Sequence, residues 1–202
     1  MVGLYYFPLP PDILADLRSI TAVRNFYRQI AKQSGAAIIE VERPEIGVCP
    51  TTRVIIKVPQ NPGMTYIGSI TLPFRDFSYV LKAQCEEQGL TGIRDAAVSG
   101  EKMAAGEITL DTETGILRGW LRDPYDSFLN DGFEMNLSEG DEYDDRFPDH
   151  PLSRLRRLLD HLQGTLRVYQ SVLFWECGLA GEKKWGARRL PEYSNPNQMV
   201  RS

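Results

Sequence analysis

The residues best suited to chemistry gather in one stretch, DEYDDRFPDHPLSRLRRLLDHLQ, which spans residues 141–163. It places a run of acids before His150 and His161, the only two histidines of the chain. Histidines and carboxylates are the usual acid–base and metal-binding groups. The stretch therefore raises three possibilities: a metal or acid–base site, a surface that binds a basic partner, or the capped start of a helix.

Helical spacing separates the two histidines. If a helix begins near Pro151, His150 and His161 share a face but lie about 16 Å apart along the axis. They cannot bind one metal ion, because a metal–nitrogen bond is only about 2 Å long. We interpret His161 as a surface residue, and Asp149 or His150 as a helix cap followed by Pro151 in the first turn. The alternative is a hydrolase that uses carboxylates around His150, either with or without a metal ion.

No motif for nucleotide binding, nucleophilic catalysis or metal binding occurs in the chain, so we expect no cofactor and no metal site. The three cysteines, Cys49, Cys85 and Cys177, are odd in number and far apart. This spacing argues against a disulfide framework and against structural zinc.

The segment 123–149 holds ten acids and a single basic residue, Arg146, in a chain of net charge −4. It is longer than an ordinary connection, and its aromatic residues can fix it to the body of the protein. Ser138 followed by Asp141 resembles a capping box that opens a short helix. Helix caps therefore explain some of these acidic residues. The other acidic residues predict a surface that binds a basic protein. Its expected contact residues are Tyr125, Phe128, Asp141, Glu142, Tyr143, Asp144, Asp145 and Asp149.

The tail 181–202 is rich in Gly, Pro, Asn and basic residues. We expect it either to solubilise the protein or to latch onto the segment 123–149 of the same chain or of a second copy. The second case allows a structural homo-oligomer held by tail exchange. The expected latch residues are Lys183, Lys184, Trp185, Arg188 and Arg189.

Hydrophobic periodicity predicts the elements that must position these groups. A strand is expected at 3–7, and an amphipathic helix over 12–35 with Asp12 at its start and Gly35 after its end. A long last helix of about six turns follows from the apolar seam between Leu152 and Leu173. The remaining expectations are strands at 36–42, 52–58, 64–72 and 77–86, a short helix at 91–98 and a hairpin over 107–121.

This order predicts an α+β fold: a two-layer sandwich in which long N- and C-terminal helices cover one face of an antiparallel sheet of about six strands. The element order resembles that of PsbP-like α/β sandwiches, a resemblance of fold that implies no activity. We expect one domain over residues 1–180, with the long acidic insertion 123–149, followed by the extended basic tail 181–202.

The function expected from these features is a non-enzymatic cytoplasmic protein-binding module. A bacterial immunity protein or a secretion chaperone that captures a basic toxin or effector fits this description, and a homodimer is possible. The negative net charge disfavours nucleic acid as a partner. No apolar run approaches the roughly 20 residues that span a bilayer, and no signal peptide is recognisable.

Overall fold

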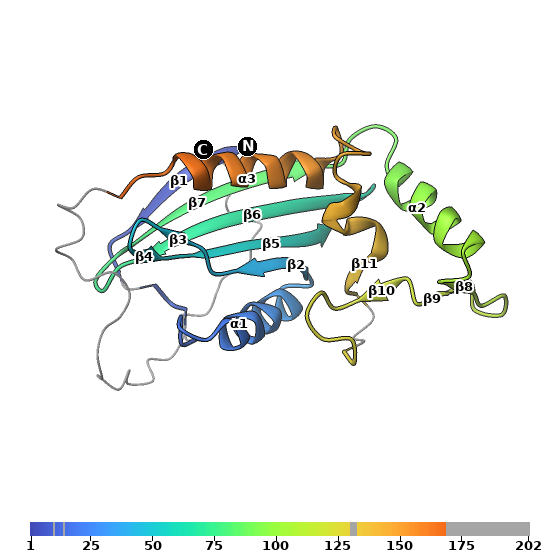
Figure 1. The fold of residues 1–202 in the computed structure, drawn as a ribbon, viewed down its shortest axis with the longest axis horizontal. Helices are drawn as coiled ribbons and strands as arrows, with labels where there is room; N and C mark the ends of the chain where they lie inside the picture. The colour runs from blue at the N-terminus through green and yellow to red at the C-terminus, as the bar shows by residue number, and fades with distance from the viewer. Residues whose placement is uncertain (10, 14, 130–132, 169–202) are drawn as a thin grey trace.

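The fold is built on a five-stranded antiparallel sheet with the strand order β1-β7-β6-β5-β2 (Figure 1). The computed structural model describes residues 1–9, 11–13, 15–129 and 133–168. The sheet strands are β1 (Val2–Phe7), β2 (Ala37–Glu42), β5 (Thr52–Pro59), β6 (Met64–Pro73) and β7 (Ser78–Glu86). The three helices of the described residues are α1 (Ile20–Gln33), α2 (Ile93–Ala104) and α3 (Pro151–Thr165).

The five expected strands of the main sheet are confirmed to within a residue or so at each end. The hairpin expected over 107–121 does not join this sheet, which therefore has five strands rather than about six. It forms a separate pair of two-residue strands around a turn that ends at Gly115, whose φ of 70° suits glycine. The minor strands are β3 (Glu45–Ile46), β4 (Cys49–Pro50), β8 (Thr109–Leu110), β9 (Leu117–Arg118), β10 (Leu121–Arg122) and β11 (Met135–Asn136).

The two long helices pack on opposite faces of the sheet, and the expected two-layer arrangement is not what forms (Figure 1). Ile55 of β5 belongs to the core cluster that contains Leu155 and Leu159 of α3. Its neighbour Val54 belongs to a second cluster, which contains Val23 of α1. Because successive strand side chains point to opposite faces, the described residues form three layers, with the sheet between α1 and α3.

Helix α1 is shorter than expected and begins at Ile20, not near Asp12. The side chain of Asp16 accepts the backbone N–H of Arg18, which is a local turn that competes with helix formation. Ser19 then caps the helix, since its Oγ accepts the N–H of Ala22 at 3.2 Å.

Helix α3 begins where the sequence predicted, because His150 caps it and Pro151 occupies its first position. The Nδ1 atom of His150 accepts the N–H of Leu152 at 3.2 Å. The helix ends at Thr165, so it is shorter than the expected six turns, and residues 169–173 of the apolar seam lie outside the described residues. Its buried seam packs on β6 and β7.

Helix α2 lies beyond one end of the sheet (Figure 1). It is longer than the expected 91–98 and follows Gly92, which has a positive φ of 74°, rather than a threonine cap. Two arginines connect α2 to the acidic segment. Arg94 of α2 donates a hydrogen bond to the carbonyl of Ser138, and Arg146 of the segment forms an ion pair with Glu101 of α2. None of the helices in the described part of the chain is both long and apolar enough to cross a membrane.

Two cysteines have different states. Cys85 is free and half-buried. Cys49 is fully buried and disulfide-bonded, although the number and spacing of the cysteines argued against a disulfide framework.

Candidate partner-binding site

Seven of the nine described acids of the segment 123–149 fall into two groups, and the other two, Asp126 and Glu134, are half-buried and buried. Asp123, Glu139 and Asp144 turn inward and form ion pairs with the body of the protein. Asp141, Glu142, Asp145 and Asp149 stay exposed, and we call these four the acidic rim. The inward acids fix the segment in place, so the rim is carried on a rigid support.

Asp123 attaches the start of the segment to α1. Its two oxygens accept Nε and Nη2 of Arg28 at 2.7 and 2.8 Å, a bidentate pair. One oxygen also accepts the N–H groups of Tyr125 and Asp126. Burial by itself would raise the pKa of Asp123, but the hydrogen bonds from Arg28 and the backbone outweigh it and leave the pKa lowered.

Glu139 is the most deeply buried of the inward acids. Its side chain is 1% exposed and contacts Nζ of Lys57, itself 2% exposed, at 2.8 Å. The same carboxylate accepts the hydroxyl of Tyr66 at 3.0 Å and the N–H of Asn136 at 2.7 Å. Burial raises the pKa of Tyr66, so its phenol stays neutral and donates.

The expected capping box is present but displaced by two residues. It joins Asn136 and Glu139, not Ser138 and Asp141, and it opens the short 3₁₀ turn Leu137–Glu139. A second 3₁₀ turn, Asp141–Tyr143, follows directly and carries two residues of the acidic rim.

Two arginines from different helices donate hydrogen bonds to the backbone carbonyls of this region. Arg94 of α2 is 1% exposed and donates to the carbonyls of Ser138 and Gly140 at 2.6 and 2.7 Å. It also pairs with Asp144 at 3.0 Å. Arg156 of α3 donates to the carbonyl of Glu139 at 2.7 Å and to the same Asp144 at 3.1 Å. Sequence reasoning missed both arginines, because only the folded chain brings them together.

The structure places the expected contact residues unevenly. Phe128 is 96% exposed, whereas Tyr143 is half-buried. Tyr125 is held inside: its ring lies 3.6 Å from the guanidinium of Arg24, and its hydroxyl accepts the N–H of Val41 at 2.6 Å. Asp144 is bound by the two arginines, so both it and Tyr125 already make contacts within the chain.

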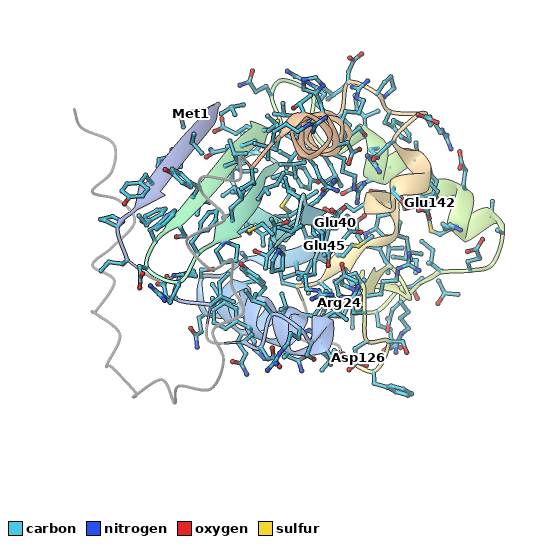
Figure 2. All side chains as sticks on the ribbon, turned by 60° about the vertical axis from the view of Figure 1, so that its left-hand side comes forward. Met1, Arg24, Glu40, Glu45, Asp126 and Glu142 are labelled. Atoms are coloured by element: carbon cyan, nitrogen blue, oxygen red, sulfur yellow. The ribbon has the colours of Figure 1, made fainter. Side chains whose placement is uncertain are left out.

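A cavity of about 250 Å³ lies beside the acidic rim. Its lining includes four acidic residues, Glu40, Glu42, Asp141 and Glu142, and two arginines, Arg122 and Arg156. Figure 2 shows Glu40 near the sheet and Glu142 on the outer side of the segment. The cavity walls are completed by Ile39, Pro124, Tyr125, Met135 and Gly140.

Glu40, one of the four acidic residues in the cavity lining, already has two arginine partners. Its Oε1 lies 2.7 Å from Nε of Arg53, and its Oε2 lies 3.6 Å from Nε of Arg156. Burial raises the pKa of Glu40 even though Arg53 opposes the shift.

His150 is committed to structural contacts at both ring nitrogens. Its Nδ1 caps α3, and its Nε2 lies 3.5 Å from Oε1 of Glu87. The hydrogen bond from His150 lowers the pKa of Glu87. The His150 ring also packs edge-on against Tyr66. Among the residues that the structure describes, no three His, Cys, Asp or Glu side chains form a group that could hold a metal ion.

The expected latch residues Lys183, Lys184, Trp185, Arg188 and Arg189 lie outside the described residues. No protein-family model matches this chain, and the search of curated proteins also finds no match.

Proposed function

We propose that the chain is a protein-binding module that captures a basic partner protein at the acidic rim and the adjoining cavity. The observation that carries this proposal is the division of the acidic segment into inward acids that anchor it and outward acids that form no ion pair with another described residue. A rigid charged surface loses little conformational freedom on binding, which favours affinity.

The rim and the cavity suit different steps of binding. Exposed carboxylates raise the rate of encounter with a positively charged partner. The cavity, with four carboxylates against two arginines, is of a size to accept one lysine or arginine side chain of that partner. Phe128 offers an exposed aromatic anchor. An immunity protein or a secretion chaperone that holds a basic toxin or effector in the cytoplasm is the biological setting that we infer.

The alternative of a hydrolase around His150 requires that residue to release either its cap or its contact with Glu87. A homo-oligomer held by tail exchange depends on residues 181–202, which lie outside the described residues. The acidic surface therefore stands as our proposal in preference to both.

The experiment begins with affinity capture from the native host and identification of the bound protein by mass spectrometry. Association of that protein is then measured at several salt concentrations with the wild type and with a fourfold variant: Asp141→Asn, Glu142→Gln, Asp145→Asn and Asp149→Asn. We expect the variant to associate at least about tenfold more slowly and to lose most of its salt dependence, because steering charges are removed. Its melting temperature should not change, since all four side chains are exposed.

A second fourfold variant controls for net charge. Asp12→Asn, Asp76→Asn, Glu86→Gln and Glu113→Gln remove four exposed acids elsewhere on the surface. This control should bind nearly as the wild type does. Equal loss of binding in both variants, or no loss in the rim variant, would refute the proposed site.

A further inference from the structure

Strand β1 forms one edge of the sheet and exposes an unusual amount of apolar surface. Figure 2 shows it at the margin of the sheet, next to the label of Met1. Its six residues, VGLYYF, include no charged residue and no proline, and its pairing with β7 has no bulge. Five of its side chains are exposed: Val2, Leu4, Tyr5, Tyr6 and Phe7. Such an edge is a template for pairing with another strand.

The free hydrogen-bonding groups of β1 belong to alternate residues. The terminal ammonium group of Met1 donates to the carbonyl of Gln84, and the carbonyl of Met1 accepts the N–H of Gln84, both at 2.9 Å, so both groups of Met1 point toward β7. Because these groups alternate in direction along a strand, Gly3, Tyr5 and Phe7 also point toward β7. Val2, Leu4 and Tyr6 therefore direct their N–H and C=O groups outward, away from the sheet.

The opposite edge of the sheet is protected by comparison. Strand β2 has a register shift between Ile38 and Glu40, and it carries the charges of Glu40 and Glu42. Helix α1 also packs against it. Bulges, charges and covering elements are the usual ways to prevent edge pairing, and β1 has none of them among the described residues.

We propose that β1 pairs with β1 of a second copy of this chain in an antiparallel, two-fold symmetric dimer. The occupant is a second copy because the strand is complementary to itself. It has no charge to repel its own image, and its outward backbone groups match those of an inverted copy. The two sheets then become one continuous sheet of ten strands, from five in each copy. This inference is independent of the acidic rim.

The positions of the outward groups determine the register. Side chains must keep to the same face, and hydrogen-bonded pairs must join outward residues from both copies. The register that uses all three outward residues places Leu4 opposite Leu4 of the second copy, and Val2 opposite Tyr6. It forms about six backbone hydrogen bonds, two for each such pair. Pro8, which has no N–H, ends the ladder.

Side chains on one face support this register. Leu4 and Tyr6 lie on the same face as Leu81 and Tyr79 of β7, their partners in the sheet. The Tyr6 ring lies 5.2 Å from that of Tyr79 and 5.9 Å from that of Phe77. Val2 of the second copy would extend this aromatic cluster, since aromatic and β-branched residues pair well across strands.

The first test is the mass of the full chain in solution across a range of concentrations. We expect twice the chain mass of 22.9 kDa, with dissociation on dilution. Leu4→Lys places two like charges opposite each other and should raise the dissociation constant by roughly tenfold or more. Leu4 is 63% exposed in one copy, so the fold should survive. Ile116→Lys, at a site 62% exposed, is the matched control and should remain dimeric.

The second test examines the register with single introduced cysteines under mild oxidation, in chains that carry Cys85→Ser to remove the free thiol. Leu4→Cys should form a cross-linked dimer, because directly opposed residues in a hydrogen-bonded pair have Cα atoms about 5.5 Å apart. Val2→Cys should not, because the two introduced thiols would lie about four residues apart along the ladder.

Two outcomes would overturn the proposal: a monomer at every concentration, and a dimer that Leu4→Lys does not weaken. If the chain is a monomer and removal of residues 169–202 speeds the hydrogen exchange of Leu4 and Tyr6, the edge is covered by the chain's own tail.

Discussion

At the scale of single residues, position decides whether an acid serves the fold or faces solvent. Asp144 and Asp145 are adjacent and identical in type, yet Asp144 contacts Arg94 and Arg156 while Asp145 is exposed. Glu139 and Glu142 differ in the same way. Buried ion pairs therefore hold the exposed acids of the candidate site in place.

The pair Glu139 and Glu142 offers a direct test of this division. Glu139→Gln removes the counter-charge of Lys57 and leaves a buried ammonium group uncompensated. We expect a loss of about 3–5 kcal/mol in the free energy of unfolding, measured by urea denaturation. Glu142→Gln should change that free energy by less than about 0.5 kcal/mol. Similar small effects for both variants would contradict the structural role of Glu139.

At the scale of elements, the close approach of α3 to β6 depends on one glycine. A Cβ atom built at Gly68 would lie 2.7 Å from Cδ1 of Leu159 and 3.1 Å from Cδ1 of Leu155. Gly68 therefore allows the leucine seam of α3 to contact the strand backbone, which closes the core on that face of the sheet.

Gly68→Ala should destabilise the protein by about 1–3 kcal/mol, because the new methyl group forces α3 away from β6 or moves two packed leucines. Gly100 provides the control, since it lies within α2 and a Cβ there would meet no atom within 4 Å. Gly100→Ala should stabilise the protein by about 0.4–1 kcal/mol. Thermal unfolding of both variants checks the sign of each change.

Most of the elements could be predicted from the sequence, whereas their arrangement in layers could not. The sheet strands are β-branched or alternating runs, or the short aromatic run of β1, and the His150–Pro151 pair marks the start of α3. The expected single layer of helices was wrong. The continuous apolar run VII at residues 54–56 does indicate burial on both faces, and it was the available signal for a third layer.

The candidate site was predictable only in part, because the pattern of acids locates the segment but not its contacts. Arg94 lies 44 residues from Ser138, and Lys57 lies 82 residues from Glu139. Hydrophobic periodicity carries no information about such pairs. The exposure of Asp141, Glu142 and Phe128 agrees with the interpretation of the sequence, whereas the burial of Tyr125 depends on the position of α1.

At the scale of the whole molecule, the proposed surfaces lie at different edges of the sheet. The cavity beside the acidic rim is lined by residues of β2, whereas the proposed dimer contact is β1. A dimer through β1 would therefore carry two acidic rims, one beyond each outer edge of the continuous sheet. The Arg28–Asp123 ion pair connects the acidic segment to α1. We expect this pair to contribute to the pH dependence of the free energy of unfolding.

The lowered pKa of Asp123 predicts the sign of this response. Between the lowered folded pKa and the unfolded value near 3.9, the unfolded chain binds more protons at this site, so stability rises with pH. The contribution is present above the unfolded pKa and is lost as pH falls through the folded pKa. Asp123→Asn should cost about 1.5–3 kcal/mol at pH 7, measured by urea denaturation.

The same variant should lose less stability than the wild type when the pH is lowered from 5 to 3, because the titrating pair is absent. Asp76→Asn, at an exposed site, should follow the wild-type curve. Parallel acid curves for Asp123→Asn and the wild type would show that the pair does not carry this dependence.

The shared carboxylate of Glu139 also implies an order of folding. The capping box is local, but Lys57 and Tyr66 become neighbours only when β5 pairs with β6, where they are register partners. The docked position of the acidic segment therefore depends on the pairing of β5 with β6. Under the function proposed above, a chain in which these two strands are unpaired would present its acids without the support of Lys57 and Tyr66.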